Sequence, residues 1–99
     1  MCFKRIYISG KVSGTDDYIE RFDRAETELK KRFPDAEVFN PVREILVSGT
    51  NLSDWKSCMV FCLAHEAFCD AIYLMDGWEN SEGARKEYQY AVKNKLTIV

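Results

Sequence analysis

The sequence lacks any run of apolar residues close to the ~20 that a membrane-spanning helix requires. Its start, MCFKRIYI, leads directly into a strand pattern and lacks the shape of a secretory signal, in which a longer apolar stretch precedes small residues at a cleavage site. We therefore expect a cytoplasmic protein with no membrane partner.

Histidine and paired cysteines are also scarce. The chain has one histidine, His65, and 4 cysteines without any Cys-x-x-Cys spacing. Cys58, Cys62 and His65 would fall on one helix, but zinc ligands normally come from more than one element. Cysteines in a protein that is not secreted usually pack as small apolar residues and form no disulfide framework. We expect neither a metal site nor a cofactor.

No charge of one sign dominates. The chain has 14 Lys and Arg residues and 16 Asp and Glu residues, so its net charge is −2, and both signs are mixed along the chain. Without a basic patch, nothing indicates a nucleic-acid partner. The 99 residues are 46% hydrophobic and 30% charged, and they show no internal repeat or linker. These values predict one globular domain that covers residues 1–99.

What the sequence does contain is an alternation of strand and helix patterns. Short apolar runs predict strands over 3–9, 37–39, 71–75 and 96–99. Apolar residues at steps of three or four, with polar caps before them, predict helices from about 15 to 33, over 55–68 and over 82–94. The segment 42–51 shows the least regular pattern, and we interpret it as a loop.

Strands that alternate with helices predict a parallel sheet with right-handed crossovers. We expect an α/β fold of the flavodoxin-like type, a three-layer sandwich around a four-stranded sheet of order 2-1-3-4. The first and third strands are neighbours in this order, so the loops that begin at Gly10 and Asp76 meet at a topological switch point. Ligands of open α/β sheets bind at such points.

Residues 69–87, CDAIYLMDGWENSEGARKE, carry the strongest functional signal. A strand pattern leads through a turn into a helix that begins near Ser81, whose hydroxyl is placed beside helix amides that favour anions. Glu87 lies six residues further on, at the edge of the apolar stripe of this helix. Spacing leaves two interpretations open: a site with an inward-facing carboxylate, or a simple cap followed by a solvated charge.

Polar residues also follow the first two strands. Ser9, Gly10 and Lys11 begin a loop in which glycine permits close backbone approach and successive amides can hold an anion. Its glycine spacing is not the dinucleotide-binding fingerprint. Tyr7 is either a half-buried strand aromatic or part of a site. Asn40 lies at the same predicted rim, either as a ligand contact or as part of a turn-forming Asn-Pro pair.

The motif Ser81-x-Gly83-x-x-x-Glu87, after a strand followed by Asp-Gly-Trp, resembles the signature of the nucleoside 2-deoxyribosyltransferase superfamily. The likeness extends from Tyr7 to Val99. It is greatest to the deoxynucleoside 5′-monophosphate N-glycosidase branch and to a group of small phage and bacterial domains.

The resemblance implies that Glu87 is the nucleophile at the anomeric carbon, that Tyr7 lies beside it and that Ser81 contacts the 5′-phosphate. It also implies that the loop after the first strand, from Ser9 through Gly10 and Lys11, encloses the sugar and phosphate. Trp78 is a candidate for stacking on the base. The expected ligand is a nucleotide or another small phosphorylated molecule, and the reaction needs no metal.

The chain departs from the resembled pattern at three positions. Lys11 stands where the N-glycosidase branch has a serine, and Ser13 stands where it has an arginine. Active members also carry an aspartate eight residues before the aspartate that opens the next strand, and counting back from Asp70 gives Cys62. That aspartate handles the leaving base or positions the sugar, so the change to Cys62 argues against efficient cleavage.

Three functions are therefore compatible with the sequence. The first is an N-glycosidase or deoxyribosyltransferase that acts on (deoxy)nucleoside 5′-monophosphates through Glu87. The second is a nucleotide-binding or sensing domain without the chemistry, and the third is a protein-interaction domain. Since a small domain has a thin core and the resembled enzymes complete their sites across subunits, we expect a homodimer or a higher homo-oligomer.

Overall fold

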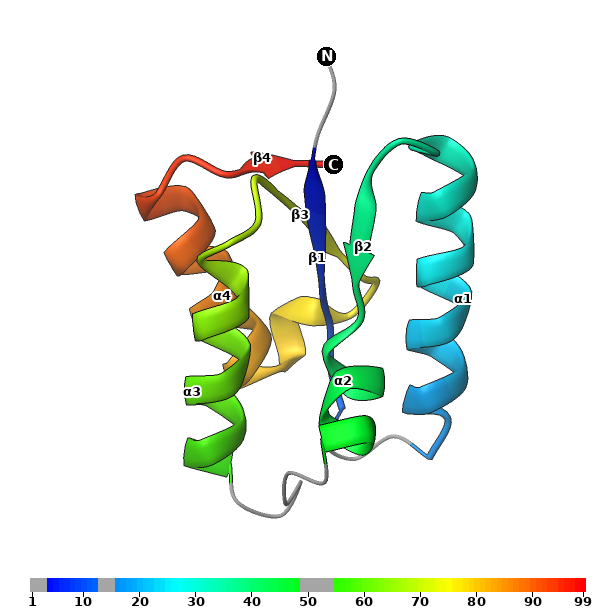
Figure 1. Cartoon of the computed structure of the whole chain (residues 1–99). Coiled ribbons are helices and arrows are strands. Elements are labelled where there is room, and N and C mark those ends of the chain that lie inside the picture. The colour runs from blue at the N-terminus through cyan, green and yellow to red at the C-terminus, as the bar shows by residue number, and fades with distance from the viewer. Residues whose placement is uncertain (1–3, 13–15, 49–54) are drawn as a thin grey trace.

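The computed structural model describes residues 4–12, 16–48 and 55–99, with only the backbone described for 45–48 and 55–58. Within these residues, four parallel strands form one sheet in the order β2-β1-β3-β4. The strands are β1 (Arg5–Ser9), β2 (Glu37–Phe39), β3 (Ala71–Leu74) and β4 (Thr97–Ile98). The predicted fold class and strand order are confirmed (Figure 1).

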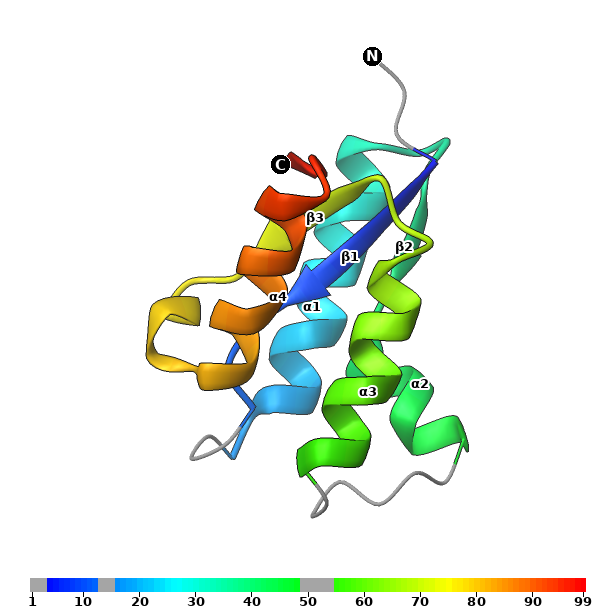
Figure 2. The ribbon, with the colours of Figure 1, turned by 90° about the vertical axis from the view of Figure 1, so that its left-hand side faces the viewer.

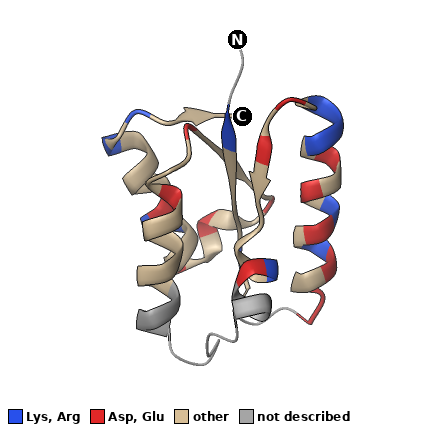
Figure 3. Ribbon diagram, viewed as in Figure 1, with Lys and Arg blue, Asp and Glu red and all other residues tan. Residues whose placement is uncertain are grey.

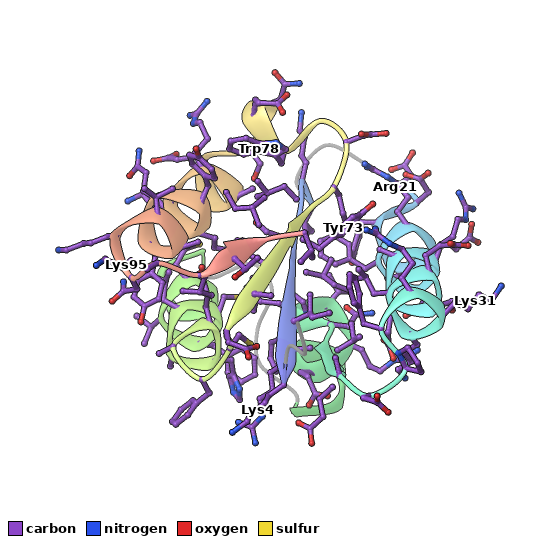
Figure 4. The ribbon with its side chains drawn as sticks, turned by 90° about the horizontal axis from the view of Figure 1, so that it is seen from above. Lys4, Arg21, Lys31, Tyr73, Trp78 and Lys95 are labelled. Atoms are coloured by element: carbon purple, nitrogen blue, oxygen red, sulfur yellow. The ribbon has the colours of Figure 1, made fainter. Side chains whose placement is uncertain are left out.

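Helices cover both faces of this sheet. Helix α1 (Tyr18–Arg32) lies on one side, whereas α3 (Trp55–Glu66) and α4 (Glu82–Lys93) lie on the other, as Figures 1 and 2 show. The short helices α2 (Pro41–Ser48) and η1 (Trp78–Asn80) follow β2 and β3 at the carboxyl edge of the sheet. Figure 4 shows the same three layers from above. None of the helices formed by the described residues has the length and apolar character needed to cross a membrane.

The alternation of side chains along β1 divides the core into two clusters. Successive strand residues point to opposite faces of a sheet. Ile6 and Ile8 accordingly pack in the cluster that contains Phe22 of α1, whereas Tyr7 packs in the cluster that contains Cys62 of α3 and Ala91 of α4. Ser9 shares the parity of Tyr7, so both side chains face α3 and α4.

The prediction of an irregular loop over 42–51 is wrong for 42–48, because α2 occupies Pro41–Ser48. The Asn-Pro pair that suggested a turn begins this helix instead. Asn40 Oδ1 accepts a hydrogen bond from the backbone N–H of Arg43 at 3.2 Å, and proline is well suited to the first helical position. Residues 49–51 lie outside the described part of the chain.

Most other predicted boundaries agree with the structure to within two or three residues. Helix α3 ends at Glu66, two residues earlier than expected, and Phe68 beyond it is 72% exposed. Helix α1 begins at Tyr18, and Asp17 makes no side-chain cap hydrogen bond. The loop expected after β3 contains the short helix η1. Residues 3 and 15, which were expected to lie at element starts, are not among the described residues.

A polar network joins α1 to α2 on the side of the sheet away from α4. The buried carboxylate of Glu26 pairs with Lys30 at 2.7 Å and with Arg43 at 3.1 Å, and Asn40 donates to it at 3.2 Å. These partners lower the pKa of Glu26 against the opposing effect of its burial. Figure 3 shows charges of both signs along α1, whereas the described part of α3 is almost free of them.

Candidate active site

Glu87 faces the sheet from α4. Its exposure is 6%, and it belongs to a buried stripe with Ala84 and Ala91. Residues three or four apart lie on the same face of a helix, which explains why a glutamate flanked by two alanines enters the interior. Of the two interpretations that the spacing allowed, an inward-facing carboxyl is the one that the structure bears out.

Two hydroxyl groups of β1 hold the Glu87 carboxyl. Tyr7 Oη donates to Oε2 at 2.5 Å, and Ser9 Oγ donates to Oε1 at 2.7 Å. Residues two apart on a strand share one face, so one short strand supplies a donor to each carboxyl oxygen. The arrangement fixes both the position and the rotation of the carboxyl group.

The surroundings bring Glu87 to the protonation range of a catalytic group. Burial raises the pKa of Glu87 to about 7, and the hydrogen bonds from Tyr7 and Ser9 oppose this rise. Burial, followed by the charge of Glu87, raises the pKa of Tyr7 well above its ordinary value, so Tyr7 remains a neutral donor. A carboxyl with a pKa near the working pH is suited to proton transfer or to nucleophilic attack.

Tyr7 is held in an aromatic and sulfur-containing environment. Its ring stacks on Phe39 at a centroid distance of 5.6 Å, and Phe39 in turn stacks on His65 at 4.6 Å. Cys62 packs in the same buried cluster and contributes to the raised pKa of Tyr7. Cys62 therefore lies beside Tyr7 at the candidate site.

The N-terminus of α4 is formed as the sequence predicts. Ser81 Oγ accepts a hydrogen bond from the backbone N–H of Ala84 at 3.2 Å, which makes it the N-cap, and Gly83 follows in the first turn. Gly77 has a φ of 84°, a conformation that favours glycine. Trp78 packs on Tyr88 of α4 with ring centroids 4.8 Å apart, so η1 is anchored against the helix.

The carboxyl edge of the sheet beside Ser9, which we call the rim, is tightly packed. The backbone N–H of Met75 donates to Ser9 O at 2.9 Å, which extends the pairing of β1 with β3 beyond its last strand residues. A Cβ at Gly10 would lie 2.8 Å from Sδ and 3.1 Å from Cβ of Met75, so any larger residue here would have to displace the Met75 side chain. Gly10 and Lys11 are half-buried here, and Arg21 of α1 donates to Asp76 O at 3.2 Å across the same edge.

Asn40 belongs to a different group of contacts. Its amide nitrogen donates to Asp23 at 3.1 Å and to Glu26 at 3.2 Å, and its oxygen caps α2. Direct hydrogen bonds thus bring together Tyr7, Ser9 and Glu87, whereas Asn40 is engaged in the network between α1 and α2. All the side-chain contacts of Asn40 described here are therefore structural, because they join α1 to the start of α2.

The sequence analysis did not select Glu66, the last residue of α3. Its exposure is 0%, and neither carboxyl oxygen has a hydrogen-bond partner among the described residues. Burial, followed by the charge of Glu87, raises the pKa of Glu66 to about 9. The available signal was its spacing of four from Cys62, which places both residues on one face of α3.

The family described as "Domain of unknown function (DUF4406)" matches residues 4–99. Comparison with curated proteins found no match, and comparison with solved structures found none. The family match spans all strands and helices of the fold, including Tyr7, Ser9 and Glu87. The chain therefore belongs to the DUF4406 family.

Proposed function

We propose that this protein cleaves the N-glycosidic bond of a (deoxy)nucleoside 5′-monophosphate, with Glu87 as the nucleophile. The observation that carries the proposal is a buried carboxyl held by two donors, Tyr7 Oη at 2.5 Å and Ser9 Oγ at 2.7 Å. A structural glutamate on a helix gains nothing from burial, whereas a catalytic carboxylate gains orientation and a pKa near neutrality.

The chemistry of glycosidic cleavage matches these properties. The anomeric carbon gains positive, oxocarbenium-like character as the bond to the base breaks, and a carboxylate stabilises or attacks that centre. The hydrogen bonds from Tyr7 and Ser9 aim the Glu87 oxygens and favour their charged form. Cleavage of this kind proceeds without a metal.

The same proposal assigns the phosphate to the rim around the start of α4. Ser81 and Gly83 lie at the helix N-terminus, where backbone amides favour anions, and Gly10 and Lys11 follow the strand that carries Tyr7 and Ser9. Trp78 lies on η1 next to this terminus and offers an aromatic surface to the base.

A nucleotide-binding domain without catalysis is the second candidate. It is favoured by Cys62, which packs with Tyr7 at the position where the resembled enzymes carry an aspartate. Such a domain would use the same rim and would bind the nucleotide without releasing its base. The two candidates therefore differ in one product that can be measured.

The test is a panel of nucleoside and deoxynucleoside 5′-monophosphates, with the free base measured by chromatography. We expect base release by the wild-type protein, loss of release in Glu87→Gln, and no change in the control Glu28→Gln, which alters an exposed glutamate of α1. Thermal stabilisation by a monophosphate without any base release would favour the binding domain. Absence of both effects would refute both candidates.

A further inference from the structure

Glu66 departs from the rule that buried polar groups are hydrogen-bonded. Its exposure is 0%, and both carboxyl oxygens are without a hydrogen-bond partner within the described part of the chain. An apolar side chain of similar volume would fill this place without the cost of desolvating a carboxyl group. Buried polar groups without hydrogen bonds are expected mainly at functional sites, which makes Glu66 a candidate for a chemical role.

The position of Glu66 relates it to the site around Glu87. It follows Cys62 by one helical turn, and Cys62 packs with Tyr7 in the cluster between the sheet and α4. Figure 2 shows α3 running antiparallel to β1, so its N-terminus lies toward the carboxyl edge of the sheet. Long helical side chains lean toward the helix N-terminus, which directs Glu66 toward the turn that contains Cys62.

The two carboxyl groups differ in their hydrogen bonds. Glu87 receives one from Tyr7 and one from Ser9, and both favour its anion. Glu66 receives none from the described residues, and the charge of Glu87 further opposes its ionisation. Two interacting buried carboxyls do not readily carry two charges. The negative charge therefore resides on Glu87 and the proton on Glu66.

We propose that Glu66 is the acid that protonates the leaving base in the reaction carried out by Glu87. A pair of carboxyls, one charged and one neutral, is the requirement for cleaving a glycosidic bond with a nucleophile and an acid. This role of Glu66 rests on the proposed function. The proton for the leaving base then comes from a residue one helical turn beyond Cys62.

The proton and electron balance of the reaction is as follows. An oxygen of Glu87 forms a bond to the anomeric carbon while the bond from that carbon to the base nitrogen breaks. The electron pair of the broken bond goes to the base, which takes the proton of Glu66. Water then attacks the anomeric carbon, releases Glu87 and returns a proton to Glu66. The products are the free base and the sugar 5-phosphate.

The test compares two leaving groups in wild type and Glu66→Gln. A purine nucleotide methylated at N7 already carries a positive charge on its base, which leaves as a neutral molecule without taking a proton. The unmethylated nucleotide needs the acid. We expect Glu66→Gln to lower base release from the unmethylated nucleotide by ~10²–10⁴-fold, the usual contribution of a general acid, and to change release from the methylated one by less than about tenfold.

Glu87→Gln is the matched variant, and it should abolish release from both nucleotides. Equal loss on both nucleotides in Glu66→Gln, or no loss on either, would overturn the role of Glu66 while leaving the proposed function intact. No release from either nucleotide by the wild-type protein would instead overturn the proposed function, and the acid role would fall with it.

A second measurement does not depend on activity. Infrared difference spectra between wild type and Glu66→Gln at pH 7 should contain the stretching band of a protonated carboxyl, which the variant lacks. Glu66→Gln should also be more resistant to thermal unfolding than the wild type at pH 7. The change removes no hydrogen bond of Glu66 seen among the described residues, and glutamine needs no proton when the chain folds. A carboxylate band in place of the protonated one would contradict the assignment.

Discussion

Tyr7 and Glu87 are 80 residues apart in the sequence, and Tyr7 Oη lies 2.5 Å from Oε2 of Glu87. The contact joins the first strand to the last helix, and it forms because β1 is central in the sheet and α4 packs over it. The hydroxyl of Tyr7 is the group that the carboxyl depends on most directly, because it lies in the interior, where no solvent replaces it.

Tyr7→Phe should therefore impair the site without disturbing the fold. The hydrogen bond from Tyr7 lowers the pKa of Glu87, so its removal should raise that pKa further above its ordinary value. If the anion of Glu87 is the reactive form, the acid limb of the kcat/KM profile should move to higher pH. The lost bond to a charged group corresponds to about 1.5–3 kcal/mol, or roughly 10- to 150-fold in rate.

Tyr73→Phe is the control for this variant, because Tyr73 packs on the α1 side of the sheet. It should leave the pH profile unchanged. An acid limb that stays in place in Tyr7→Phe, or that moves equally in both variants, would show that Tyr7 does not set the protonation of Glu87.

The stability of the protein should decrease as the pH rises from about 5 to 9. The pKa values of Glu87 and Glu66 are raised from 4.5 to about 7 and about 9, so the folded state binds more protons than the unfolded state across this range. Stability then falls with increasing pH. For Glu87, the raised pKa corresponds to a loss of about 3 kcal/mol in the free energy of unfolding as the pH rises through this range.

Urea unfolding at pH 5, 7 and 9 measures this slope. Glu66→Gln should flatten the curve between pH 5 and 9, because glutamine cannot ionise, and Glu87→Gln should flatten it between 5 and 7. Asp70 and Glu26 have lowered pKa values, so their stabilising contributions are lost only as the pH falls through the acid range. A wild-type curve without slope between pH 5 and 9 would contradict the raised pKa values of the two interior carboxyls.

The parallel sheet and the inward face of Glu87 could be predicted from periodic signals, whereas the strand order followed from the expected flavodoxin-like fold and the pairing of Tyr7 with Glu87 from the family resemblance. Alternation of strand and helix patterns determines a parallel sheet, and a spacing of two on a strand puts Tyr7 and Ser9 on one face. Glu87 follows from the spacing of Ala84 and Ala91. These spacings are local patterns that can be recognised in a single sequence.

Glu66 and α2 could not be predicted for different physical reasons. Helix α3 is apolar around most of its circumference, with Val60 exposed and Cys62 buried, so its sequence does not indicate which face turns inward. From the sequence, Glu66 at the end of this helix is therefore expected to be exposed to solvent. The Asn40-Pro41 pair suits both a turn and a helix start, and the choice depends on partners such as Asp23 and Glu26, which lie far away in the sequence.

Asn40→Ala should destabilise the protein by about 1–2 kcal/mol, since it removes the cap of α2 and a donor to the buried Glu26 carboxylate. The pKa of Glu26 should rise, because the hydrogen bond from Asn40 is among the contacts that lower it. Chemical denaturation measures the loss. Asn80→Ala, at an exposed position of η1, is the control and should change stability by less than about 0.5 kcal/mol.

Gly10→Ala should destabilise the rim because the added methyl group would lie 2.8 Å from Sδ and 3.1 Å from Cβ of Met75. The sulfur is the flexible end of its side chain, but the Cβ is fixed to the backbone of the residue that pairs with Ser9 O. We expect a loss of about 1–3 kcal/mol in the free energy of unfolding, the usual cost of overpacking.

Met75→Ala costs stability by itself because it leaves a cavity, and in the double variant the new methyl group enters that space. The double variant should therefore be more stable than the sum of the two losses predicts, by at least about 0.5 kcal/mol in a double-mutant cycle. Additive losses would show that Gly10 is constrained by something other than its contact with Met75.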